Sequence, residues 1–148
     1  MRAVPTVLLF AMLTACAPKE EAPPATPAPP PGPTLADFAG SWVNTSMLEG
    51  VTDPVMSTMT GTADATMWTM SLQGRDSIPV TVSISGDSLI GQTAEYESIL
   101  RKGVMVSVRT ASVLRDGALT GVMVATYKTP AGVEVANGTM TGMRAPPK

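Results

Sequence analysis

Apolar and polar residues alternate along most of the chain beyond residue 34. The clearest run, at 78–85, reads IPVTVSIS, and every second residue in it is apolar. Because successive side chains of a strand point to opposite faces, this pattern indicates a half-buried strand. Similar alternation predicts eight strands, near 41–48, 66–73, 78–85, 88–97, 104–114, 118–128, 132–136 and 139–145.

Turn signals separate these runs at hairpin intervals. Gly-Asp at 86–87, Asp-Gly at 116–117 and Asn-Gly at 137–138 accept the positive φ angles of tight turns. The strands are therefore expected to be antiparallel and sequential. Eight such strands predict an all-β domain over 34–148, an up-and-down barrel whose closure removes exposed sheet edges. The irregular segment 49–65 is expected to be the longest loop.

The N-terminus has the pattern of a targeting segment. Met1-Arg2 provides a positive start, an apolar run extends from Val4 to Leu13, and Leu-Thr-Ala precedes the single cysteine, Cys16. We therefore expect a signal peptide over 1–15, because the apolar run is shorter than the roughly twenty residues that span a bilayer. The Leu-Thr-Ala-Cys sequence resembles the lipobox of bacterial lipoproteins. That resemblance implies lipidation of Cys16 and anchoring of the exported protein to a membrane of the cell envelope.

The segment after Cys16 is rich in proline. Eight of the seventeen residues from Ala17 to Pro33 are proline, and none has a side chain that would build a core. We expect 16–33 to be an extended, semi-rigid linker between the lipid anchor and the barrel. By the lipoprotein resemblance, Ala17 in place of an aspartate favours the outer membrane in a Gram-negative host.

Composition excludes several kinds of chemistry. The chain has no histidine and one cysteine, so it cannot form a Ser-His-Asp triad, an internal disulfide or a common Cys/His zinc site. Its net charge of −2 and its 15% content of charged residues do not indicate a nucleic-acid partner. No phosphate-binding loop or metal-ligand cluster is apparent. We therefore expect a protein that is not an enzyme and holds no cofactor or metal.

The two ends of the domain carry a family resemblance. Phe38-Ala39-Gly40-Ser41-Trp42 is similar to the first-strand signature of the lipocalins and their calycin relatives, in which Gly-x-Trp follows a short helical turn. The resemblance implies that Trp42 closes one end of the barrel and that Arg144, near the end of the last strand, packs over its face. The domain is shorter than most lipocalins and lacks their disulfide. A second likeness, of 40–44 and 116–121 to avidin-type barrels, would make Asn44 and Ser46 ligand-facing, but two tryptophans are too few for a biotin site.

The predicted barrel suggests non-covalent binding of a small hydrophobic or amphipathic molecule, such as a fatty acid or lipid. The alternative is a filled barrel that acts as an envelope interaction module, such as an accessory subunit or a protease inhibitor. In the first hypothesis the ligand's apolar surface is buried in the barrel under a 49–65 lid. The candidate ligand-binding residues are Trp68, Met70, Leu72, Val80, Val82 and Val106, with Met56 and Met59 from the lid.

Overall fold

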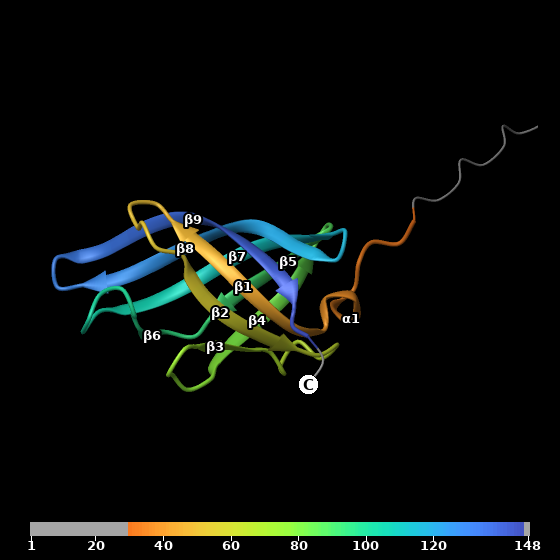
Figure 1. Cartoon of the computed structure of the whole chain (residues 1–148), viewed down its shortest axis with the longest axis horizontal. Coiled ribbons are helices and arrows are strands. Elements are labelled where there is room, and N and C mark those ends of the chain that lie inside the picture. The colour runs from red at the N-terminus through yellow and green to blue at the C-terminus, as the bar shows by residue number, and fades with distance from the viewer. Residues whose placement is uncertain (1–29, 147–148) are drawn as a thin grey trace, which may run out of the picture. The chain divides into compact units, whose positions relative to one another are not determined.

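The computed structural model describes residues 30–146, which form one helical turn and nine β-strands. The predicted signal peptide, Cys16 and most of the proline-rich segment lie outside the described residues. The elements are α1 (Leu35–Phe38), β1 (Gly40–Leu48), β2 (Val55–Gly61), β3 (Thr69–Leu72), β4 (Ile78–Ser85), β5 (Ser88–Thr93), β6 (Tyr96–Glu97), β7 (Met105–Arg115), β8 (Ala118–Thr129) and β9 (Gly132–Arg144) (Figure 1). No helix within 30–146 is long and apolar enough to cross a membrane.

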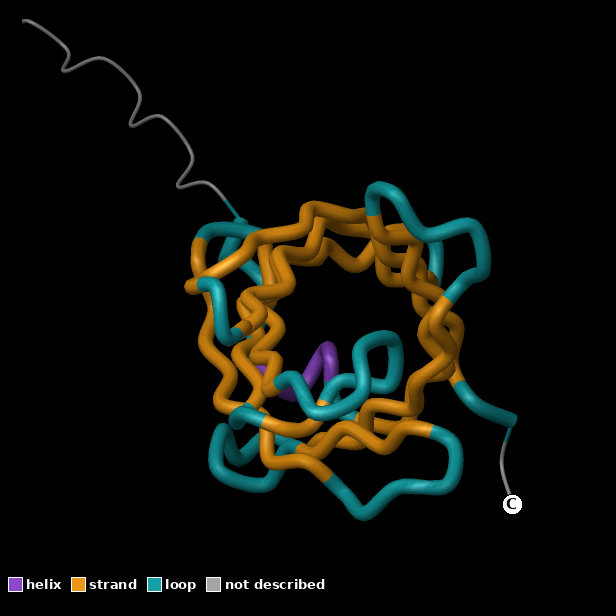
Figure 2. The backbone as a smooth tube through the Cα atoms, turned by 90° about the vertical axis from the view of Figure 1, so that its left-hand side faces the viewer, coloured by secondary structure: helices purple, strands orange, loops and turns teal. Residues whose placement is uncertain are grey.

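The strands form a closed, antiparallel barrel. Each long strand pairs with its neighbours in sequence, β9 returns to pair with β1, and the β5–β7 pairing completes the ring. The two-residue β6 pairs only with β7, so eight strands make the wall. Figure 2 looks along the barrel axis, with the ring of strands in front and α1 at the far end. The predicted all-β, eight-stranded, up-and-down barrel is confirmed.

Two of the three predicted hairpin turns are present. Gly86 lies between β4 and β5, and Asp116 and Gly117 lie between β7 and β8, all with positive φ angles. The turn predicted at 137–138 is wrong, because β9 runs unbroken from Gly132 to Arg144. Gly138 instead permits a close approach between strands, since a Cβ atom there would lie 2.4 Å from the carbonyl oxygen of Met47 on β1. The runs 132–136 and 139–145 are therefore parts of one strand.

The predicted long loop at 49–65 is also wrong, because β2 occupies its centre. The sequence pattern of β2 does not predict a strand. Two of its inward positions are Ser57 and Gly61, whereas the apolar Met56 points outward and is 49% exposed. Gly61 is inward because the indole ring of Trp68 lies against it. Only residues 49–54 and 62–68 remain as connections on either side of this strand.

Two apolar clusters fill different parts of the barrel. The first packs α1 against the adjacent end of the barrel, and its buried members are Phe38, Trp42, Met59, Trp68, Val80, Val82, Leu89 and Leu119. The second lies toward the opposite end and contains Leu48, Val106, Val108, Met123, Ala125 and Tyr127. We call the end of the barrel at the first cluster the closed end, and the end at the second cluster the open end. The space between the clusters is where a ligand could be held.

Candidate functional site

The closed end is built around Trp42 and Arg144, the pair that the lipocalin resemblance implies. The guanidinium carbon of Arg144 lies 4.4 Å from the centre of the Trp42 ring. Arg144 also donates hydrogen bonds to the carbonyl oxygens of Ala39 (2.8 Å) and Asp37 (3.0 Å), and Trp42 Nε1 donates to the carbonyl oxygen of Phe38 (2.8 Å). These contacts fasten α1, β1 and β9 together, and they form a floor beneath the barrel interior.

Gly40 belongs to the same arrangement for a steric reason. Its φ angle is +125°, and a Cβ atom there would lie 2.7 Å from Nη1 of Arg144. A larger residue would therefore strain the backbone and displace the guanidinium group. Gly40, Trp42 and Arg144 thus act together in closing this end of the barrel.

A cavity of about 70 Å³ lies inside the barrel. Every strand of the wall contributes to it, and most of the side chains around it are apolar. Four methionines, Met59, Met70, Met123 and Met140, face it from four strands. Such unbranched side chains adapt their shape to irregular partners. The other lining residues are Asn44, Ser46, Leu48, Val55, Ser57, Leu72, Val80, Gly91, Thr93, Tyr96, Ser98, Ile99, Leu100, Val106, Val108, Thr110, Ala125 and Tyr127.

Five of the eight candidate ligand-binding residues face this cavity: Met59, Met70, Leu72, Val80 and Val106. Trp68 and Val82 do not line it. Both belong to the closed-end cluster, as do Met59 and Val80, which reach the cavity as well. Met56 was expected in a lid, but it lies on the outer side of β2. Val80 and Val82 point to the same face of β4, but only Val80 lines the cavity. Val82 is the next inward residue along β4 and lies closer to the closed end.

The polar side chains of the cavity differ in how their hydrogen bonds are satisfied. Thr93 Oγ1 accepts a hydrogen bond from the backbone N–H of Val108 at 2.9 Å. Ser98 Oγ accepts from the N–H groups of Leu100 and Arg101, each at 3.1 Å. The amide oxygen of Asn44 is buried and has no hydrogen-bond partner. Asn44 is thus the polar group in the described barrel whose environment needs a further explanation.

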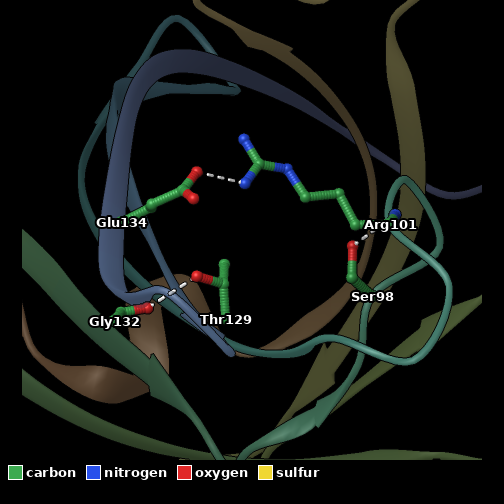
Figure 3. Close-up of polar contacts among 5 residues, drawn as sticks. All are labelled: Ser98, Arg101, Thr129, Gly132 and Glu134. Carbon is green, nitrogen blue, oxygen red and sulfur yellow. Dashed lines mark hydrogen bonds and ion pairs between the residues drawn. The ribbon is translucent and has the colours of Figure 1, made fainter.

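The open end is covered by the connection 98–104. Ile99 and Leu100 line the cavity from this connection, although each is also partly exposed to solvent. Arg101 lies over the ring of Tyr127, 4.3 Å from its centre, and pairs with Glu134 of β9. Figure 3 shows the Arg101 side chain extending from this connection toward Glu134. Since both members of the pair are exposed, this ion pair contributes little to holding the connection in place.

Tyr96 provides a way to examine the environment of the cavity. Burial raises the pKa of its phenol to about 12, with a further contribution from the nearby Tyr127 and an opposing one from Arg75. Because the folded pKa lies above the unfolded value of about 10, the neutral phenol contributes stability that is complete below pH 10. That stability is lost as the pH rises from about 10 to about 12.

We therefore expect the protein to lose about 1–2 kcal/mol more than its Tyr96→Phe variant between pH 9 and pH 11.5. Urea unfolding at the two pH values measures this difference, and the comparison cancels the titration of lysines common to both proteins. Equal losses in the two proteins would show that Tyr96 ionises as freely as an exposed tyrosine.

The side chains that surround the cavity carry no formal charge. No group of three or more His, Cys, Asp or Glu side chains within residues 30–146 is placed to hold a metal ion. The cavity lining contains hydroxyl, amide and phenol groups, but no acidic or basic side chain that would act as a general acid or base at neutral pH. No protein-family model, curated protein or solved structure matches the chain. The class that the fold and the site define is a closed, eight-stranded β-barrel with an internal cavity of mixed polarity.

Proposed function

We propose that this chain is an exported, lipid-anchored barrel of the lipocalin-like type that binds a small amphipathic molecule and does not catalyse a reaction. The observation that carries the proposal is the cavity between the closed-end cluster and the 98–104 connection. Its walls are mainly apolar, so burial of a ligand's apolar surface would contribute about 25 cal/mol per Å². A few polar groups among apolar walls are typical of sites that orient small molecules.

The size of the cavity limits the ligand. A volume of about 70 Å³ is about half of the ~150 Å³ that accommodates benzene in an engineered apolar cavity. A fatty acid or another lipid-like ligand therefore requires the four methionines to change rotamer and Ile99 and Leu100 to move outward. Both changes involve flexible side chains or a surface connection. Short amphipathic molecules fit with smaller adjustments.

Export and anchoring form the second part of the proposal. The Leu-Thr-Ala-Cys sequence supports lipidation at Cys16, and the proline-rich segment up to residue 33 would hold the barrel away from the membrane. The cell envelope is then the place of action, on the outer membrane if the host is Gram-negative. The stacking of Arg144 on Trp42 supports kinship with the lipocalins.

A second candidate function, an envelope interaction module, is favoured by the outer surface of the barrel. Apolar residues that are 57–67% exposed lie on the outer faces of β8 and β9. Val43 of β1 pairs directly with one of them, Met143, so the apolar surface continues onto the next strand. The exposed large apolar residues of β8 and β9 are Val122, Val133, Val135 and Met143. A protein partner could cover such a surface.

Native mass spectrometry of the full protein, extracted from membranes of its own host, tests both functions. We expect an added mass of small-molecule size that survives gentle ionisation and disappears on denaturation. Ala125→Leu adds three carbon atoms inside the cavity and should remove this mass, whereas Ala118→Leu adds them at a half-buried position outside the cavity and should retain it. A bound polypeptide instead of a small molecule would favour the interaction module, and a bare mass for all three proteins would contradict the binding proposal.

A further inference from the structure

The β8–β9 hairpin extends beyond the strand that pairs with the other side of β9. β8 pairs with β9 from Gly132 to Met143, whereas β1 pairs only with the part from Gly138 to Arg144. Figure 1 shows the hairpin projecting at the left, beyond the connection that follows β1. Among the described residues, 132–136 therefore have a strand on one side only, and their other side is a free sheet edge.

β1 stops beside this edge because the chain turns there. The backbone N–H of Val51 donates a hydrogen bond to the carbonyl oxygen of Leu48 at 3.1 Å, and does not continue the ladder along β9. Gly50, with a φ angle of +77°, permits this turn. The free edge of β9 is thus a consequence of the local turn after β1.

The main-chain groups that face the free edge belong to Val133 and Val135. The N–H of Glu49 donates to the carbonyl oxygen of Asn137 at 2.8 Å, so Asn137 presents its main chain on the side of β9 that faces β1. Alternate residues of an antiparallel strand direct their N–H and C=O groups to the same side, so Val135 and Val133 do likewise. No hydrogen bond from another described residue reaches these groups on that side.

The side chains along the edge leave it open to a further strand. Val133 and Val135 point outward and are 67% and 60% exposed. On the opposite face of β9, Gly132 and Ala136 have small side chains or none. Proline, lysine and bulges commonly protect sheet edges, and 132–136 has none of them. Such an edge is a template for pairing with another chain.

We propose that this edge pairs with the same edge of a second copy of the chain, with the two strands antiparallel and a two-fold axis beside Glu134. Glu134 is the middle residue of 132–136, so this register pairs the whole free edge of one copy with the whole free edge of the other. Val133 then lies opposite Val135 of the second copy, and their main-chain groups face each other and form hydrogen bonds. A second copy therefore matches the length and the hydrogen-bonding pattern of the edge by symmetry.

The ion pair at the open end is compatible with this register. The Glu134 side chains of the two copies lie opposite each other, and like charges in that position are unfavourable. Each carboxylate is paired with Arg101 of its own chain, however, so the group around the axis is neutral overall. The edge is small compared with the roughly 20–30 residues a side of a stable interface, so we expect a reversible dimer. The pairing goes beyond ligand binding and does not depend on the cavity.

Disulfide cross-linking in intact cells of the host tests this register. Residues opposite each other at a non-hydrogen-bonded position have Cα atoms about 4.5 Å apart, a separation that a disulfide can span. Glu134→Cys places one thiol from each copy at such a position, so mild oxidation should join two copies there. Trypsin cleaves after Lys128 and Arg144, so mass spectrometry should find peptide 129–144 joined to itself, a product distinct from any disulfide of Cys16.

Val122→Cys is the matched control for random collisions. Val122 also points outward and is 57% exposed, but it lies on β8 away from the free edge. A second pair of variants, made in the Glu134→Cys chain, tests the main-chain hydrogen bonds. Val135→Pro removes the N–H that faces the edge without removing a hydrogen bond to β8, and it should reduce the cross-linked product about tenfold. Val135→Thr retains this N–H and should retain the product.

The unsubstituted chain provides a check that needs no cysteine. Pairing should slow hydrogen exchange of the Val135 amide as the protein concentration rises, and it should leave the Val122 amide unchanged. Equal Val135 rates at all concentrations would contradict the proposal, and this result decides the question if Val135→Pro does not fold.

The cross-linking results have equally definite meanings. No self-linked peptide from Glu134→Cys, or equal yields from Val135→Pro and Val135→Thr, would overturn the proposal. A peptide of another protein joined to 129–144, without the self-linked product, would show that a strand of that protein occupies the edge instead. None of these results would affect the proposed binding of a ligand in the cavity, which native mass spectrometry tests separately.

Discussion

Replacing Gly61 by alanine is expected to lower the free energy of unfolding by about 3 kcal/mol or more. A Cβ atom on Gly61 would lie 2.1 Å from Cδ2 of the Trp68 ring, a separation that no packed structure tolerates. Trp68 is 1% exposed, and its Nε1 donates a hydrogen bond to the carbonyl oxygen of Thr62 at 2.9 Å. The ring therefore has no free space into which it can move, so the clash has to separate β2 from the closed-end cluster.

Urea unfolding followed by circular dichroism measures this loss. Gly32→Ala is the matched control, because its nearest contact would be an ordinary 3.7 Å to the carbonyl oxygen of Gly86. A Trp68→Leu background provides a second check, since a smaller side chain should relieve most of the additional cost of Gly61→Ala. A cost that is unchanged in this background would show that Gly61 is required for some reason other than the Trp68 ring.

Gly61 also explains why part of the fold could not be predicted from the sequence. Alternation identifies a strand when one face is apolar, as in β4, where inward Ile78, Val80 and Val82 alternate with outward residues. In β2 the inward face carries Ser57, which lines the cavity, and Gly61, which receives a ring from another segment. Because Ser57 and Gly61 are not large apolar residues, the inward face of β2 lacks the apolar alternation that would have identified it as a strand.

The same reasoning applies to the Asn-Gly pair at 137–138. Asp116 and Gly117 form a turn because both adopt positive φ angles there. Gly138 is a glycine for a different reason, the approach of the Met47 carbonyl from β1, and that contact joins residues distant in sequence. Sequence alone does not distinguish a glycine required by a local turn from one required by a neighbouring strand.

The candidate site was only partly predictable for a geometric reason. Alternation shows which residues face inward, and five of the proposed ligand-binding residues do line the cavity. The depth of a residue along the barrel axis depends on strand tilt and stagger, which alternation does not determine. Val82 and Trp68 consequently belong to the closed-end core. Asn44 did carry a signal, because a polar residue stands between Trp42 and Leu48 at an inward position of β1.

Replacing Trp42 at the closed end by alanine is expected to lower the free energy of unfolding by about 3–5 kcal/mol. The Trp42 side chain is fully buried among residues of α1, β2 and β8, and its removal leaves a cavity that the barrel wall cannot fill. The variant also loses the hydrogen bond to the carbonyl oxygen of Phe38 and leaves Arg144 without its aromatic partner. Thermal and urea unfolding measure the loss, and a change below about 1 kcal/mol would contradict the role of Trp42 as the centre of this core.

A double-mutant cycle then separates the stacking of Arg144 on Trp42 from its two hydrogen bonds. Trp42→Leu removes the aromatic face and Arg144→Met removes the positive charge, so their coupling energy measures the cation–π contact, expected at about 0.5–2 kcal/mol. The hydrogen bonds to Ala39 and Asp37 are lost in both Arg144→Met backgrounds and do not contribute to this coupling. A coupling near zero, with a large effect of Arg144→Met alone, would show that Arg144 closes the barrel by holding the backbone around α1, with the tryptophan ring acting only as a packing surface.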